Sequence, residues 1–216
     1  MTEFKPYPYQ RACIDFVKMN RPYDISQPTA LLLDMGLGKT IITLTALYEL
    51  GIEGKLRGNV LVIAPLSVSI NTWAKETAKW DHLKNIQVEV LTTIKNKKKR
   101  HQRYEEIKND PIPKIYTINI SKVADIIDYF GDDWCFPNIV LDELQKFRSH
   151  SAKCVKSMQK LHALNKKIVD QAIQENNREL YENRPIQRII GLTGTPAPKG
   201  LINLWGEISS LDGGLR

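Results

Sequence analysis

The sequence has only three cysteines, Cys13, Cys135 and Cys154, and they lie far apart with no CxxC pair. Their number and spacing exclude a zinc knuckle and a disulfide framework, and they suit a reducing compartment. The longest continuous apolar run, Val60–Ala64, is far shorter than the roughly 20 residues that a membrane-spanning helix needs. The N-terminal segment MTEFKPYPYQ also lacks the apolar core of a signal peptide. We therefore expect a cytoplasmic protein with no membrane partner.

The chain also lacks internal repeats, low-complexity tracts and any linker rich in proline, glycine or serine. Aromatic residues are only 8% of its 216 residues, beside 42% hydrophobic and 25% charged residues, which is a globular composition and not a disordered or fibrous one. A chain of this length buries roughly 70% of the surface that its unfolded form exposes, so it folds without a metal or disulfide. The net charge of +7 favours polyanionic partners, but only mildly. We expect one domain.

Short apolar runs alternate with helix-like stretches along the chain. The expected strands are Thr29–Leu33, Val60–Ala64, Val88–Thr92, Lys114–Asn119, Ile139–Asp142 and Arg188–Thr193. The expected helices are Tyr9–Lys18, Thr40–Leu50, Ser69–Trp80, Lys122–Phe130 and Ala152–Leu164. Most of the strands are continuously apolar, which is typical of a parallel sheet covered on both faces. The alternation predicts an α/β fold, a mostly parallel sheet flanked by helices, with ligands at the carboxyl ends of the strands.

A glycine-containing loop, Asp34–Thr40 (DMGLGKT), joins the first expected strand to the next helix. This is the context of a phosphate-binding loop, because glycine lets the backbone approach the phosphates and the helix amides donate to them. Lys39 would reach the β- and γ-phosphates of ATP, and the Thr40 hydroxyl would ligate Mg²⁺. Leu33 stands where the general pattern has glycine, so the alternative is a glycine-rich turn that opens an ordinary helix. The candidate nucleotide-binding residues of the loop are Met35, Gly36, Leu37, Gly38, Lys39 and Thr40.

A pair of carboxylates, Asp142 and Glu143, ends the expected strand Ile139–Asp142. Acids in this position lie at the carboxyl edge of the sheet, beside the phosphate loop. Asp142 can hold Mg²⁺ through its water shell, and Glu143 can orient and deprotonate the attacking water. An acidic pair after a strand is also a common helix N-cap. Together with the loop at Lys39, however, it indicates nucleotide hydrolysis, with Lys39 and Glu143 as the candidate catalytic residues.

With these motifs placed, the chain resembles the first motor domain of superfamily-two helicases and translocases over nearly its whole length. The likeness is greatest to the Swi/Snf-type branch and to the helicase-like proteins of phages. Asp34–Thr40 is similar to motif I of that branch, including the absence of glycine at Leu33, and Asp142–Gln145 stands where the family has DExH or DExQ. Leu192–Pro196 (LTGTP) matches motif III, and Pro8–Gln10 resembles the N-terminal glutamine motif.

The resemblance also implies residues that face nucleic acid. Val62–Ser67, with the tail that contains Trp73 and Trp80, looks like motif Ia, and it implies that the loop at Pro65 and Ser67 grips the nucleic-acid backbone. The alternative is that Pro65 and Ser67 only end a strand and cap the following helix. Both readings are compatible.

Four more residues receive roles from the resemblance. It implies that Gln10 reads the adenine edge, although a PYQ triplet is often only a loop-to-helix start. It implies that Thr117 marks motif Ib. It also implies that Thr193 and Thr195 couple the nucleotide to the nucleic-acid face, although Thr193–Pro196 could be a plain turn.

For the whole protein, the resemblance implies a RecA-like P-loop NTPase domain over residues 1–216 that binds Mg·ATP and nucleic acid, with DNA favoured over RNA. It implies that the second motor domain, with its arginine finger, is absent from this chain and is supplied in cis or in trans. We expect weak turnover from the chain alone. The alternatives are a different P-loop enzyme, such as a kinase or transport ATPase, and a binding module that is inactive without a second domain.

Two segments depart from the regular alternation. Lys95–Arg103 is a dense basic run that is either a solvated loop or an electrostatic contact with nucleic acid or a neighbouring domain. Lys160–Arg188 is a long polar segment with a narrow apolar stripe, and it predicts an inserted or extended helix that is largely solvated.

Overall fold

The computed structural model describes residues 2–19, 28–147, 153–195 and 201–214. Its centre is a six-stranded sheet in the order β1-β6-β5-β2-β4-β3, in which every pairing is parallel. The strands are β1 (Thr29–Leu32), β2 (Val60–Ala64), β3 (Val88–Val90), β4 (Ile115–Asn119), β5 (Asn138–Asp142) and β6 (Arg188–Thr193). The carboxyl ends of parallel strands share one edge of the sheet, so the segments after β1, β6 and β5 are neighbours. The predicted α/β fold is confirmed.

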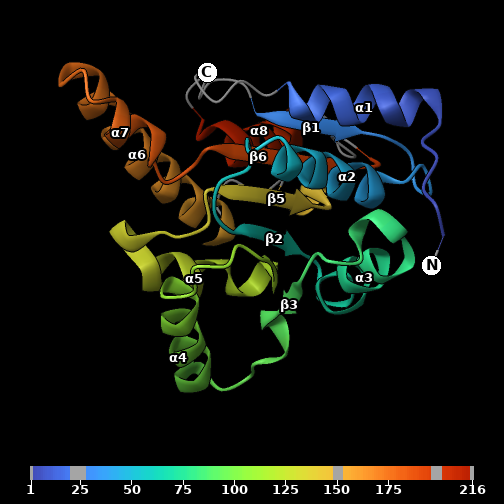
Figure 1. The fold of residues 1–216 in the computed structure, drawn as a ribbon. Helices are drawn as coiled ribbons and strands as arrows, with labels where there is room; N and C mark the ends of the chain where they lie inside the picture. The colour runs from blue at the N-terminus through green and yellow to red at the C-terminus, as the bar shows by residue number, and fades with distance from the viewer. Residues whose placement is uncertain (1, 20–27, 148–152, 196–200, 215–216) are drawn as a thin grey trace.

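Helices cover both faces of this sheet (Figure 1). They are α1 (Pro8–Lys18), α2 (Lys39–Ile52), α3 (Leu66–Lys79), α4 (Lys97–Lys108), α5 (Val123–Phe130), α6 (Lys153–Gln174), α7 (Arg178–Glu182) and α8 (Leu201–Asp212). None of the described helices is long and apolar enough to cross a membrane.

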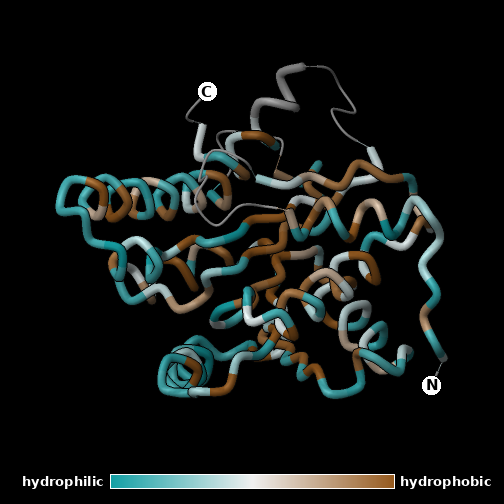
Figure 2. The backbone as a smooth tube through the Cα atoms, turned by 45° about the horizontal axis from the view of Figure 1, so that its top comes forward, coloured by the Kyte–Doolittle hydropathy of each residue, from teal (hydrophilic) through white to brown (hydrophobic). Residues whose placement is uncertain are grey.

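Two hydrophobic clusters hold the layers together. One joins α1, α2 and α3 to the sheet and contains Val62 of β2 and the fully buried Trp73 of α3. The other joins α4, α5, α6 and α8 to the opposite face and contains Ile63 of β2 and Phe130 of α5. Adjacent residues of one strand therefore serve different clusters, which explains why the strands are apolar throughout. Figure 2 shows the hydrophobic colour running through the centre of the molecule, with hydrophilic segments around it.

Several boundaries differ from the sequence prediction, and three of them change how the segment packs. β3 ends at Val90 because the chain turns into a 3₁₀ helix, Leu91–Thr93, whose first two residues are buried. α3 begins at Leu66 and not at Ser69, so the motif that follows β2 is already helical. α6 spans 22 residues and joins the predicted helix Ala152–Leu164 to the polar segment after it.

The polar segment Lys160–Arg188 is less exposed to solvent than its composition predicts. α6 packs against α5, α7 and α8, and it buries Leu161, Val169 and Ala172. His162 and Asn165 of the same helix are also buried, and the Asn165 side chain accepts a hydrogen bond from the Ile186 amide at 2.8 Å. The apolar stripe therefore belongs to the core, and only the opposite side of the helix is exposed.

Candidate nucleotide-binding site

The phosphate loop lies between β1 and α2, and two glycines determine its path. Gly36 and Gly38 have φ values of 83° and 82°, in the left-handed region that favours glycine. Gly38 is the N-cap of α2, and a Cβ there would lie 2.8 Å from Nε2 of Gln10 and 3.1 Å from Cγ2 of Ile41. The loop therefore needs glycine at position 38 for its backbone conformation and for its close contact with α1.

Lys39 is the first residue of α2, and its ammonium group lies over the phosphate loop. Its Nζ donates to the carbonyl oxygens of Leu33 at 2.8 Å and Asp34 at 3.1 Å. Gly194, which follows β6, is close by, since a Cβ on it would lie 3.5 Å from this Nζ. Thr40 is half-buried in the first turn of α2. The amides at the start of α2, the glycine turn and one ammonium are the groups that bind the phosphates of a nucleotide.

The N-terminal helix α1 holds the phosphate loop from one side. Gln10 is 7% exposed, and its Nε2 donates to the carbonyl of Leu37 at 3.4 Å while its Oε1 accepts from the Tyr7 amide at 3.0 Å. The hydroxyl of Tyr9 donates to the same Leu37 carbonyl at 3.2 Å. Adenine recognition by Gln10 stays a prediction, while in this structure its amide supports the loop. Sequence reasoning missed the contact of Tyr9.

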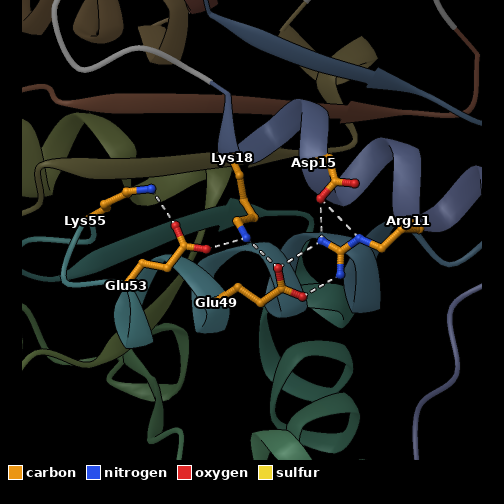
Figure 3. Close-up of polar contacts among 6 residues, drawn as sticks. All are labelled: Arg11, Asp15, Lys18, Glu49, Glu53 and Lys55. Atoms are coloured by element: carbon orange, nitrogen blue, oxygen red, sulfur yellow. Dashed lines mark hydrogen bonds and ion pairs between the residues drawn. The ribbon is translucent and has the colours of Figure 1, made fainter.

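A cluster of charged side chains joins α1 to α2, and we call it the helix-pair network (Figure 3). Its members are Arg11, Asp15, Lys18, Glu49, Glu53 and Lys55. Glu49 is central, since its carboxylate accepts from both terminal nitrogens of Arg11, at 2.7 and 2.9 Å, and from Lys18 at 2.7 Å. The hydrogen bonds from Arg11 lower the pKa of Glu49 to about 2, and Lys18 adds to this effect. The network fixes the helix that carries Tyr9 and Gln10.

The two predicted carboxylates lie at the end of β5, and the structure holds them differently. Asp142 is 6% exposed, and its Oδ2 accepts a hydrogen bond from the Trp73 indole at 2.9 Å while its Oδ1 accepts from the Glu143 amide at 3.0 Å. Burial raises the pKa of Asp142, and the Trp73 hydrogen bond acts in the opposite direction. Glu143 is half-buried with φ at 60°, a conformation that costs energy for a non-glycine residue and is concentrated at functional sites.

Gln145 connects the acidic strand end to the segment after β6. Its Nε2 donates to Oε2 of Glu143, and its Oε1 accepts from the hydroxyl of Thr193 at 2.6 Å. The same hydroxyl oxygen accepts from the Thr195 amide at 3.2 Å. We call Trp73, Asp142, Glu143, Gln145 and Thr193 the strand-end network. Sequence reasoning placed Gln145 in a motif without giving it a role, and the structure makes it the link between two motifs.

The strand-end network also reaches the phosphate loop, because the Leu33 amide donates to the carbonyl of Thr193 at 3.1 Å. Lys39, Glu143 and Thr193 thus lie at adjacent strand ends. Thr195 is exposed, and Pro196 of the same motif lies outside the described residues. Within those residues no group of three His, Cys, Asp or Glu side chains has the arrangement of a metal site. Asp142 and Thr40 still suit Mg²⁺, which in such sites takes few protein ligands and completes its shell with water and phosphate.

The residues predicted to face nucleic acid separate into two groups. Pro65 is the N-cap of α3, and Ser67 is exposed in the first turn of that helix without capping it. Thr117, in contrast, is fully buried, and its hydroxyl donates to the carbonyl of Ser69 at 2.6 Å. Thr117 is therefore covered by α3 in this structure, because its position in β4 points it into the domain, and its place in motif Ib stays a prediction.

The basic run is not a uniform solvated loop, because it forms the start of α4. Lys97, Lys98 and Lys99 are exposed. Arg100, however, is only 7% exposed, and its Nε donates to Oδ2 of Asp125 on α5 at 2.8 Å. Lys97 also forms an ion pair with Asp125, at 3.9 Å, and Lys95 before the helix is exposed too. The exposed lysines of the run can meet a polyanion, whereas Arg100 holds α4 against α5.

Comparison with known proteins agrees with this geometry. The SNF2-related domain family matches residues 9–182. Protein p41 of Acyrthosiphon pisum secondary endosymbiont phage 1 is 34% identical over 217 residues, which cover 100% of this chain and 41% of that protein. The human DNA excision repair protein ERCC-6-like is 28% identical over 172 residues, which cover 80% of this chain and 12% of that protein.

Among solved structures, the Sulfolobus solfataricus SWI2/SNF2 ATPase core in complex with dsDNA superposes with a TM-score of 0.68 at 23% identity. The alignment covers 100% of this chain and 39% of that one. Because only 23% of the aligned residues are identical, the match shows the fold alone. The chain thus spans less than half the length of the relatives it matches. With its sheet order, phosphate loop and acidic strand end, this chain belongs to the SNF2-related domain family, as a Swi/Snf-type motor domain of helicase superfamily two.

Proposed function

We propose that this chain is the ATP-binding half of a nucleic-acid-dependent ATPase, which couples hydrolysis of Mg·ATP to movement on DNA. One observation carries the proposal: the ammonium of Lys39, the carboxylates of Asp142 and Glu143, and the hydroxyl of Thr193 lie at three adjacent strand ends. Phosphate binding, metal binding and activation of water need these groups side by side. We place the activity in the cytoplasm, of a host cell if the protein is phage-encoded.

Each residue has a distinct role in this proposal. Lys39 steadies the β- and γ-phosphates, and the amides of the loop from Met35 to Thr40 cradle them. The Thr40 hydroxyl and the Asp142 carboxylate hold Mg²⁺, which neutralises charge on the phosphate oxygens when it is bound. Glu143 orients the attacking water and accepts its proton. Gln145 holds Glu143 and Thr193 in one hydrogen-bonded unit, so that a shift of either residue reaches the other.

The proposed nucleic-acid surface lies further along the same edge of the sheet. The exposed first turn of α3, with Pro65 and Ser67, follows β2, which is the neighbour of β5. Helix N-termini and hydroxyls bind phosphate oxygens of nucleic acid. The Sulfolobus ATPase core is in complex with dsDNA, which supports DNA as the polymer. Stimulation of turnover by DNA distinguishes this function from that of another P-loop enzyme.

A second RecA-like domain, in cis or in trans, completes the proposed site. Phosphoryl transfer needs positive charge on the developing transition state, and an arginine finger is typically worth about 10³–10⁵ in rate. We assign that arginine to the second domain, and we expect the first domain alone to bind nucleotide and to turn it over slowly. Without a second domain, the chain would act as a binding module.

The test compares Lys39→Ala and Glu143→Gln with the parent chain. Calorimetry should show at least a roughly 10-fold loss of Mg·ATP affinity for Lys39→Ala, because charged hydrogen bonds to phosphate are lost from an exposed loop. Glu143→Gln should bind normally and fail to turn ATP over when a second motor domain is supplied. Lys166→Ala, on the exposed side of α6, is the control. Equal affinity of Lys39→Ala and the parent would refute the proposal.

A further inference from the structure

Trp73 makes an unusual contact for a core aromatic residue. It lies in the middle of α3 and is fully buried, yet its indole N–H donates to Oδ2 of Asp142 at 2.9 Å across 69 residues of sequence. An indole has one donor and no acceptor, so a buried tryptophan needs an acceptor for its N–H. A carboxylate is a strong acceptor for such a donor, because the hydrogen bond is charge-assisted.

The contact fixes the orientation of the Asp142 carboxylate. Its Oδ1 is held by the Glu143 amide at 3.0 Å, which is a local main-chain contact, and its Oδ2 is held by Trp73. Two donors on opposite oxygens leave the carboxylate little freedom to rotate. The remaining lone pairs of both oxygens stay available, since a carboxylate accepts about four hydrogen bonds or metal bonds.

Trp73 can fix another residue only if α3 is itself fixed, and the start of α3 is anchored one turn earlier. The carbonyl of Ser69 accepts from the Thr117 hydroxyl at 2.6 Å, and the hydroxyl of Ser69 accepts from Thr92 at 3.0 Å. Ser69 and Trp73 are four residues apart, so they lie on the same side of the helix. The buried Thr117 therefore supports the helix that presents the indole to Asp142.

We propose that Trp73 is a positioning residue for Mg²⁺, whose indole N–H holds the Asp142 carboxylate in the orientation that binds the metal of the nucleotide complex. The inference rests on the proposed function, which makes Asp142 a metal ligand. Trp73 itself touches neither metal nor nucleotide. The competing explanation is that Trp73 only fills the core between α3 and the sheet.

Trp73 in α3 and Trp80, the C-cap of that helix, allow a matched test. Trp73→Phe keeps an aromatic ring in the core and removes the N–H. Trp80→Phe removes an N–H that donates to Glu76 at 2.8 Å, a local contact at the end of α3. Replacement of Trp73 by benzothienylalanine, in which sulfur takes the place of N–H in a ring of nearly the same size, keeps the packing should Trp73→Phe fold poorly.

The measurement is calorimetric binding of ADP to the full chain, without divalent metal and at increasing Mg²⁺. For Trp73→Phe and the benzothienylalanine variant, we expect the ADP affinity without metal to lie within about 2-fold of the parent. The increase in ADP affinity on adding Mg²⁺ should be roughly 10-fold smaller than in the parent, because one charge-assisted hydrogen bond to Asp142 is lost. Trp80→Phe should keep the full gain. In an Asp142→Asn background, loss of the Trp73 N–H should add nothing further.

The outcomes separate the inference from the proposed function. A full metal-dependent gain in a folded variant that lacks the Trp73 N–H would overturn the inference and leave Trp73 as a packing residue. An equal loss in Trp80→Phe would also overturn it, because the effect would then follow from weakening α3 in general. A parent chain that binds no nucleotide, or binds it equally with and without Mg²⁺, would instead refute the proposed function.

Discussion

Two polar networks border the phosphate loop, and they are built in opposite ways. The helix-pair network lies at the surface between α1 and α2, and the side chains of Arg11 and Glu49 are 37% and 25% exposed. The strand-end network lies inside the domain, where Trp73 and Thr193 are fully buried. The first network uses full charges and several alternative partners. The second is a chain of hydrogen bonds in which each donor has one acceptor.

The difference determines what each network contributes. Ion pairs between partly exposed side chains are screened by salt and contribute little free energy each, but they hold two helices in a fixed relative position. A buried hydrogen bond also contributes little net free energy, yet its loss leaves a desolvated group without a partner. Removing a member of the strand-end network should therefore lower the free energy of unfolding more than removing a member of the helix-pair network does. The loss should also depend less on the salt concentration. We expect the surface network to tolerate change and the buried one to set the geometry of the site.

The largest effect is expected for Thr193→Val. Valine keeps the shape of threonine in the buried end of β6, but it removes the hydroxyl that donates to Gln145 and accepts from Thr195. We expect a loss of about 1–3 kcal/mol in the free energy of unfolding, independent of salt. Urea denaturation at low and high sodium chloride measures it. Thr43→Val is the control, because the buried hydroxyl of Thr43 donates only to the Lys39 carbonyl of its own helix.

A result in which Thr193→Val is as stable as the parent would remove the energetic contrast between the networks. If Thr193→Val loses the expected free energy of unfolding but the loss depends strongly on salt, then charge, and not the buried hydrogen bond, stabilises the strand end.

A smaller effect is expected for Glu49→Gln. The change removes the charge that Arg11 and Lys18 share, and we expect a loss of about 1 kcal/mol in the free energy of unfolding at low salt. The loss should shrink in 1 M sodium chloride, where the Debye length is about 3 Å. Lys55→Ala, which removes an exposed partner of Glu53, is the control and should change the free energy of unfolding by less than Glu49→Gln does. A loss that persists at high salt would contradict the assignment to ion pairing.

The smallest expected effect is the pH dependence of the stability difference between the parent chain and Glu49→Gln. The folded pKa of Glu49 is lowered from its ordinary value of 4.5 to about 2, so the charge of Glu49 stabilises the fold fully at any pH above that ordinary pKa. The stabilisation is lost as the pH falls from about 5 toward 2. The stability difference between the parent and Glu49→Gln should therefore narrow over this range, while that for Thr193→Val stays constant there. If the stability difference between the parent and Glu49→Gln stays constant between pH 5 and 3, then Arg11 and Lys18 do not hold Glu49 ionised.

Much of the fold followed from local patterns. Most of the strands contain a continuous apolar run, because both faces of the sheet are covered, and such runs are visible without knowledge of the partners. The phosphate loop and the acidic strand end were found for a related reason. Their chemistry depends on neighbours in the chain, such as glycine before Lys39 and the strand before Asp142, so spacing alone identifies them.

Sequence reasoning did not anticipate contacts that depend on packing between distant segments. Thr117 carries a hydroxyl at the predicted position of a nucleic-acid motif, but β4 lies between β2 and β3 and turns this side chain toward α3. Arg100 belongs to a basic run that predicts an exposed contact, yet Asp125 on α5 draws it into the interior. In both cases a partner supplied by another element decided the result.

The amino-acid sequence by itself determined the order of the six strands and of most helices along the chain, and the motifs of the phosphate loop and the acidic pair, because these depend on hydrophobicity and on residues that are adjacent in the chain. The helices α4 and α8 were not predicted. Only the tertiary structure decided which side chains meet at the site. Trp73 and Asp142 are 69 residues apart, and Gln145 and Thr193 are 48 apart. Their contacts arise from the order of β2, β5 and β6 in the sheet and from the way α3 packs on it, and no local pattern encodes a distance across the fold.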